Sequence, residues 1–135
     1  MTRYVLDASV AIAATRPKEP AFAVASARLA RALSGADELV VPATFAIEVA
    51  GVLGRAGLPE ADIRAFLDAL TRSPHEVVTL GPKRARLIGK VAVATKLRGV
   101  DAVYVWLAAR EGVPVCTLDQ EMATRGAAVC KVIAP

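Results

Sequence analysis

The chain has 135 residues with 17 Lys or Arg against 13 Asp or Glu, which gives a formal net charge of +4 at pH 7. This length corresponds to one domain, and a hydrophobic content of 55% excludes intrinsic disorder, which requires low hydrophobicity and high net charge. The longest segment without a charged residue, 39–47, is less than half of the roughly 20 residues that cross a bilayer, so no membrane span is expected.

Short apolar strands alternate with helices along the predicted chain. The pattern predicts strands at residues 4–6, 39–41, 77–80 and 113–118, and a fifth at 129–133. It predicts helices at residues 20–33, 44–55, 59–72, 82–97 and 101–110. Because the strands are continuous apolar runs, they indicate an α/β fold with a mostly parallel sheet covered on both faces. Such sheets bind ligands beyond the carboxyl ends of their strands, where the strand order reverses.

Four carboxylates lie at predicted strand ends or in apolar surroundings. Asp7 closes the first strand, Asp119 follows the fourth, and Asp101 opens a helix that is otherwise uncharged up to Arg110. Glu48 is the only charged residue within residues 39–54, and its helix offers no polar face on which it would be solvated. An ionised carboxylate in an apolar site costs several kcal/mol unless it is paired, protonated or bound to a cation.

Each of these carboxylates also has a purely structural interpretation. Asp7 and Asp101 fit helix N-caps, and Asp119 fits a turn residue that bonds its local backbone. Glu48 fits an ion pair with an Arg from elsewhere in the chain. Taken together, converging carboxylates without imidazole or thiolate favour a hard cation such as Mg²⁺ or Mn²⁺. Such an ion activates water and offsets charge on a phosphodiester.

The remaining polar residues add little further chemistry. Ser9 and Thr117 lie two residues from Asp7 and Asp119, and they either orient these carboxylates or are ordinary hydroxyls. One His and two Cys are too few for a His/Cys zinc site or a disulfide framework. We expect His75 at the surface. The cysteines are expected to be small buried hydrophobes, as in a reducing compartment. Asp7 comes too early in the sequence for a signal peptide, so a cytoplasmic location is expected.

A basic stretch precedes Asp101 in the sequence. It contains six basic residues and no acidic one: Lys83, Arg84, Arg86, Lys90, Lys96 and Arg98. On a helical wheel Lys83, Arg86 and Lys90 share one face. This face, together with Arg98, is a candidate RNA contact, and the alternative is an ordinary solvated helix surface.

Four segments resemble PIN-domain proteins, and more narrowly the VapC toxins of bacterial and archaeal toxin–antitoxin pairs. They are RYVLDAS (3–9), VPATFAIEVAGVL (41–53), LRGVDAVYVWLA (97–108) and VCTLDQEM (115–122). The resemblance spans almost the whole chain and implies a single PIN domain over residues 1–135. The implied fold is Rossmann-like, with a short, mostly parallel sheet flanked by helices.

The resemblance also implies an acidic ribonuclease site. Asp7, Glu48, Asp101 and Asp119 match the family's four acids, and the three aspartates among them would hold Mg²⁺ or Mn²⁺. Ser9 and Thr117 match its recurrent hydroxyl positions, whereas Glu121 is an auxiliary acid outside the fixed pattern. Members of the family cleave RNA hydrolytically and leave a 5′-phosphate. They commonly form homodimers or toxin–antitoxin hetero-oligomers, with a VapB antitoxin that wraps the toxin near its site.

Other functional classes make different demands on the sequence. A non-catalytic RNA-binding or partner-binding PIN domain, and a PIN nuclease of RNA processing without an antitoxin, both remain open alternatives. A signalling receiver domain needs a second acid beside the first and a Lys after its last strand. Here Ala8 and Ser9 follow Asp7, and Lys131 lies within the last apolar segment. The absence of a GxGxxG or GxxxxGK[ST] loop argues against dinucleotide and P-loop binding.

Overall fold

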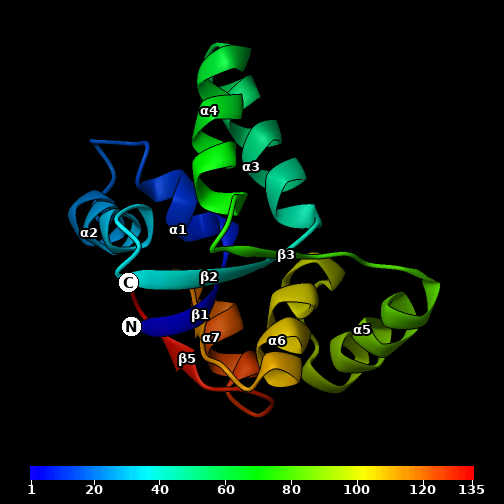
Figure 1. The fold of residues 1–135 in the computed structure, drawn as a ribbon. Coiled ribbons are helices and arrows are strands. Elements are labelled where there is room, and N and C mark those ends of the chain that lie inside the picture. The colour runs from blue at the N-terminus through cyan, green and yellow to red at the C-terminus, as the bar shows by residue number, and fades with distance from the viewer.

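The computed structural model describes all residues from Met1 to Pro135 as one parallel sheet with helices on both faces (Figure 1). The five strands are β1 (Thr2–Leu6), β2 (Asp37–Pro42), β3 (Glu76–Val78), β4 (Val115–Cys116) and β5 (Val132–Ile133). The seven helices are α1 (Ala8–Ala13), α2 (Phe22–Leu33), α3 (Thr44–Arg55), α4 (Glu60–Thr71), α5 (Pro82–Thr95), α6 (Gly99–Glu111) and α7 (Gln120–Gly126). The predicted α/β class with a parallel sheet is therefore confirmed.

The strand order of the sheet is β3-β2-β1-β4-β5, with β1 at its centre. All four neighbouring pairs are parallel, and β1 pairs with β2 on one side and β4 on the other. The chain therefore builds outward from β1 in one direction and then crosses back to place β4 on the other side. This reversal of strand order lies between β1 and β4, where α/β sheets place their ligands.

Helices α1–α4 lie on one face of the sheet and α5–α7 lie on the other (Figure 1). The α3–α4 pair projects away from the sheet as a hairpin, and the helices predicted at residues 44–55 and 59–72 are confirmed. Helix α6 lies on the opposite face, and every residue from Asp101 to Ala108 is buried. A helix that is apolar all round must be enclosed, which explains why this one offers Asp101 no polar face.

Two short helices escaped the sequence prediction. Helix α1 has 6 residues and helix α7 has 7, which is too short for an apolar periodicity to be recognised. Helix α2 begins at Phe22 instead of Pro20, because the preceding residues form successive turns such as Phe22 N–H to Glu19 C=O. None of the helices combines the length and apolar character needed to cross a bilayer.

The expected surface position of His75 is wrong. The side chain is only 8% exposed, and its Nδ1 accepts a hydrogen bond from the Leu39 backbone N–H at 3.0 Å. The ladder between β2 and β3 begins with the pair Val40 and Glu76. The imidazole therefore supplies an acceptor for a buried β2 amide that lies just before the ladder begins.

Close packing of α7 on α6 gives a test of the fold. A Cβ added at Gly126 would lie 2.9 Å from Val105 Cγ2, and the β-branched Val105 side chain is buried and stiff. We expect Gly126→Ala to lower the free energy of unfolding by about 1–3 kcal/mol, measured by urea denaturation. Gly89→Ala is the matched control, because nothing lies within 4 Å of its added Cβ. It should raise stability by about 0.5–1 kcal/mol. Wild-type stability in Gly126→Ala would contradict this packing.

Candidate active site

The fold brings the predicted acidic residues to the carboxyl end of the sheet. Asp7 directly follows β1, and Asp119 follows β4 on the adjacent strand. Glu48 comes from α3 on one face of the sheet, and Asp101 comes from the first turn of α6 on the other. The four carboxylates thus meet from both layers of helices at the reversal of strand order.

Asp7 is the most deeply buried of these acids, with only 4% of its surface exposed. Its Oδ2 accepts hydrogen bonds from Ser9 Oγ at 2.6 Å and Thr117 Oγ1 at 2.7 Å. Although Asp7 occupies the N-cap position of α1, its side chain makes no capping hydrogen bond. The helix-cap interpretation of Asp7 is therefore wrong.

Burial raises the pKa of the Asp7 carboxyl. The two hydroxyl hydrogen bonds lower this pKa, and the charges of Asp101 and Asp119 raise it again. Asp37, a solvent-shielded carboxylate at the start of β2, has the opposite environment: Arg31 donates to both of its oxygens, and that contact lowers its pKa. The comparison shows that the chain pairs a buried carboxylate with a cation elsewhere and leaves Asp7 without one.

The hydroxyls of Ser9 and Thr117 tie the ends of β1 and β4 together. Ser9 Oγ accepts a hydrogen bond from Leu118 N–H at 3.1 Å, and Thr117 Oγ1 accepts one from Asp119 N–H at 3.0 Å. Each hydroxyl therefore donates to Asp7 while it accepts from the segment that carries Asp119. This arrangement fixes the two aspartates relative to each other.

Glu48 is held by a tyrosine instead of an arginine. Tyr104 Oη donates a hydrogen bond to Glu48 Oε1 at 2.8 Å, and Glu48 forms no ion pair. Burial raises the pKa of Glu48, the hydrogen bond from Tyr104 lowers it, and the charges of Asp7 and Asp101 raise it. Tyr104 was not predicted as a site residue. Its spacing of three residues from Asp101 on one helix was the available signal.

Asp101 does not cap its helix, because α6 begins earlier, at Gly99. Its Oδ2 accepts a hydrogen bond from Arg98 Nε at 3.1 Å, although the Arg98 side chain itself is 71% exposed. Burial raises the pKa of Asp101, and the guanidinium of Arg98 opposes that rise. Among the basic residues predicted to contact RNA, Arg98 is the one that touches an acidic site residue. The others, Lys83, Arg86 and Lys90, lie exposed on α5 without acidic partners.

Asp119 combines a local structural contact with its place in the site. Its Oδ1 accepts a hydrogen bond from Met122 N–H at 3.0 Å and so caps α7. The backbone-bonding interpretation of Asp119 is therefore correct for one oxygen. Glu121 lies on the exposed side of α7, where it pairs with Arg125 at 3.0 Å.

A common pattern joins the four carboxylates. Each one has a single oxygen on a protein donor, and its other oxygen accepts no hydrogen bond. All four of these oxygens are at least partly exposed to solvent, because the buried polar atoms that lack a partner belong to other residues. These free oxygens suit a hard divalent cation as ligands, because all of them are carboxylate oxygens. As they stand, no three of the side chains enclose a position for a metal ion.

Comparison with known proteins identifies the family and the fold. The PIN domain family model matches residues 4–127. The chain is similar to the crystal structure of PAE2754 from Pyrobaculum aerophilum, with a TM-score of 0.70 and 22% identity over 98% of this chain and 90% of that one. It is also similar to VapBC2 from Rickettsia felis bound to a DNA fragment from their promoter, with a TM-score of 0.68 and 11% identity over 99% of each chain.

A third similar structure is VapBC-5 from Mycobacterium tuberculosis, a member of the VapBC family of toxin–antitoxin systems. Its TM-score is 0.58 and its identity is 22% over the full length of both chains. No curated protein sequence matches the chain significantly. At these identities the likeness to solved structures shows a shared fold.

The raised pKa of Asp7 predicts an unusual response of stability to substitution. A raised pKa means that protonation of Asp7 favours the folded state, so its ionisation at neutral pH is destabilising. We expect Asp7→Asn to raise the melting temperature at pH 7 in EDTA by a few degrees. This gain should shrink as the pH falls through the raised pKa of Asp7, because the folded wild type then takes up the proton.

Added Mn²⁺ should raise the melting temperature of the wild type and not that of Asp7→Asn, because a ligand of the folded state stabilises it. Asp68→Asn, which removes an exposed carboxylate on α4, is the control and should respond to Mn²⁺ as the wild type does. A lower melting temperature for Asp7→Asn than for the wild type at pH 7 in EDTA would show that the Asp7 charge is not destabilising.

Proposed function

The chain belongs to the PIN-domain family, and on this premise we propose that it is a VapC-type toxin, a metal-dependent endoribonuclease that hydrolyses RNA phosphodiester bonds. One observation carries the proposal. Four carboxylates, Asp7, Glu48, Asp101 and Asp119, meet at the reversal of strand order, and each keeps one oxygen free of protein donors. The most buried of them, Asp7, has no cationic partner, whereas Asp37 at the opposite end of the sheet is paired with Arg31.

We assign Asp7, Asp101 and Asp119 as the residues that would hold Mg²⁺ or Mn²⁺. When bound, the ion would supply a Lewis acid that activates water and offsets the negative charge developing on the phosphodiester. Asp7 is fixed for this role by the Ser9 and Thr117 hydroxyls. The same hydroxyls hold the segment that carries Asp119, so the two carboxylates move together.

Glu48 is the residue we assign to the attacking water. Its Oε1 is held by Tyr104, which leaves Oε2 to orient the water and accept its proton. Burial raises the pKa of Glu48, and a carboxylate with a raised pKa is a stronger general base near neutral pH. Tyr104 therefore acts as a positioning residue.

We expect basic side chains to bind the RNA substrate. The α5 face that carries Lys83, Arg86 and Lys90 is exposed and unpaired, and Arg98 lies where α6 begins. Contacts to phosphates supply affinity without reading sequence, so this surface fits RNA of many sequences. Arg98 has a second effect, because its guanidinium offsets the charge of Asp101.

We further propose a cognate VapB-type antitoxin as the partner, together with a homodimeric or hetero-oligomeric assembly in the cytoplasm. Support comes from the VapBC proteins of Rickettsia felis and Mycobacterium tuberculosis, whose structures share this fold. A short adjacent reading frame for a DNA-binding protein distinguishes a toxin from a PIN nuclease of RNA processing. Its absence would remove the toxin assignment and leave the nuclease assignment.

Loss of the Asp7 carboxylate tests the nuclease assignment. Asp7→Asn should reduce the kcat for RNA cleavage in Mg²⁺ by about a hundredfold or more, while the protein remains folded. Asp68→Asn, with the same chemical change on the exposed face of α4, should cleave at the wild-type rate. EDTA should abolish cleavage by both the wild type and the control. Equal cleavage by Asp7→Asn and the wild type would refute the assignment, and a wild type that binds RNA without cutting it would favour a non-catalytic PIN domain.

The hydrogen bond from Tyr104 predicts a shift in pH dependence. It lowers the pKa of Glu48, so its removal in Tyr104→Phe should raise that pKa. If Glu48 must be ionised to accept a proton, the acidic limb of kcat/KM should move to higher pH.

Tyr4→Phe is the matched control, because the Tyr4 hydroxyl is also buried but has no hydrogen-bond partner. Its pH profile should match that of the wild type. Identical acidic limbs in Tyr104→Phe and the wild type would remove Glu48 from the proton transfer.

A further inference from the structure

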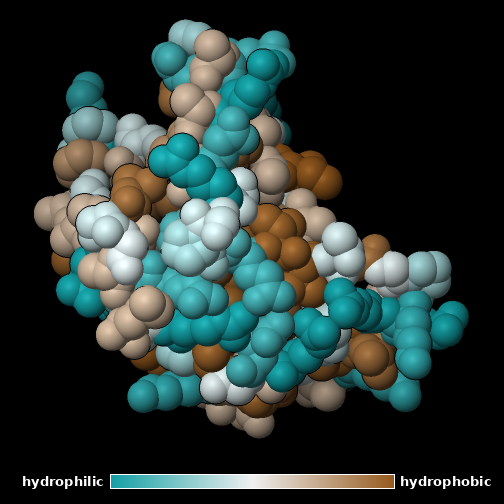
Figure 2. Space-filling view, in the orientation of Figure 1, coloured by the Kyte–Doolittle hydropathy of each residue, from teal (hydrophilic) through white to brown (hydrophobic).

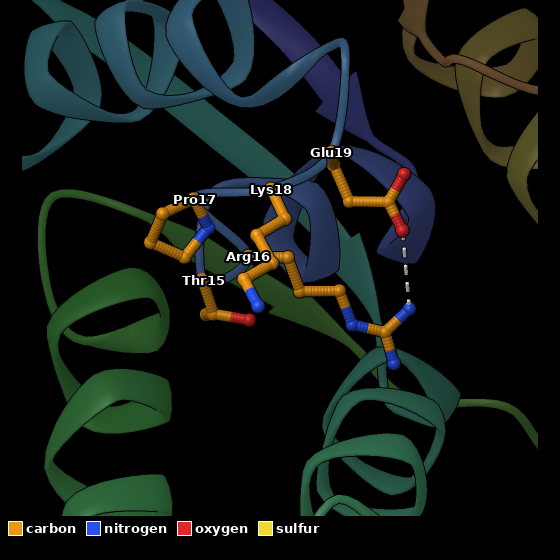
Figure 3. A pocket seen from close by; sticks show the side chains of 5 residues that line it. All are labelled: Thr15, Arg16, Pro17, Lys18 and Glu19. Carbon is orange, nitrogen blue, oxygen red and sulfur yellow. Dashed lines mark ion pairs between the residues drawn. The ribbon is translucent and has the colours of Figure 1, made fainter.

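A cavity of about 490 Å³ opens beside the acidic site. Its wall combines residues of α1, of the connection from α1 to α2, and of the loop between β4 and α7. Two residues of the acidic site, Ser9 and Asp119, belong to this wall. The cavity therefore continues directly from the carboxylates toward the connection that carries residues 15–19, whose side chains Figure 3 shows.

The cavity has apolar walls and a single cation. Ile12, Leu118 and Pro20 contribute apolar surface, and Arg16 is its only basic residue. Arg16 Nη1 lies 3.7 Å from Glu19 Oε1, and the two side chains point toward each other (Figure 3). Both side chains are more than 40% exposed, so this ion pair is weak and is easily exchanged for a stronger anion.

We propose that this cavity binds one unpaired nucleotide of the RNA, next to the phosphodiester that is cut, and that Arg16 contacts the phosphate of that nucleotide. Glu19 is the internal anion that Arg16 leaves when RNA binds. The inference rests on the proposed ribonuclease function, since it assigns the cavity to the substrate of the same acidic site. It adds a substrate contact on the side of the site away from α5.

Size and chemistry favour a nucleotide as the occupant. The volume lies in the range of about 300–1,000 Å³ that is typical of small-molecule sites, and the apolar walls suit the faces of a base. A base can enter such a cavity only when it is unpaired, which selects single-stranded RNA or a loop. The acidic cluster repels phosphates, so a cation is needed at the rim of the cavity, where the RNA strand leaves the acidic site. Arg fits this role because its planar fork binds two phosphate oxygens at once.

Binding without turnover tests the cavity separately from the nuclease. In an Asp7→Asn background, the affinity for a fluorescently labelled pool of random single-stranded hexaribonucleotides is measured by anisotropy. Adding Arg16→Gln should weaken binding by about tenfold or more, because a charge-assisted contact to phosphate is lost. Lys18→Gln is the matched control. It removes the same charge from the same exposed connection, but Lys18 does not line this cavity, so its effect should be less than about threefold.

Glu19→Gln should strengthen binding a few-fold, because Arg16 is then free of its internal partner. A duplex RNA of the same length should compete poorly. Equal losses in Arg16→Gln and Lys18→Gln would overturn the proposal, since they would mean a diffuse charge effect. Failure of the wild type to cut RNA would refute the nuclease and leave this binding comparison intact, so the two failures are distinguishable.

Discussion

The site depends on one buried carboxylate that has no cationic partner. Asp7 ends the central strand, and two hydroxyl groups hold it in place of a guanidinium. Burial raises its pKa, and the two neutral donors do not offset this rise, so its charge opposes folding at neutral pH. The opposite end of the sheet shows that the alternative was available, since Arg31 pairs Asp37 through two hydrogen bonds. In our account, the unpaired charge is retained because a cation in the functional complex offsets it.

The rest of the fold serves to hold this arrangement. The reversal of strand order places β4 beside β1, so Thr117 reaches Asp7 across the sheet although the two residues are far apart in sequence. Helix α6 is buried along most of its length and carries both Asp101 and Tyr104. The rigidity of this helix fixes Asp101 directly and fixes Glu48 through the Tyr104 hydroxyl. Both layers of helices therefore contribute to one site, and the sheet sets their separation.

The class of fold and the convergence of the four acidic residues on one site were predicted from the sequence, because both follow from local patterns. Apolar runs mark the strands, and an acid at a strand end or in an apolar helix is visible without coordinates. The Tyr104–Glu48 hydrogen bond was not predictable in this way, since it joins helices on opposite faces of the sheet. The prediction that His75 lies at the surface was wrong for the same reason. Its ring accepts a hydrogen bond from the backbone N–H of Leu39, which belongs to another strand. Helices as short as α1 and α7 carry too few residues for a periodic signal.

In the proposed mechanism, the free oxygens of Asp7, Asp101 and Asp119 are ligands of a catalytic divalent cation. Crystals soaked in Mn²⁺ and measured near the manganese absorption edge test it most directly. We expect an anomalous peak bonded to Asp7 Oδ1 and to at least one of Asp101 and Asp119. A site without a peak, at a Mn²⁺ concentration at which the protein cleaves RNA in solution, would refute the assignment of these aspartates as metal ligands.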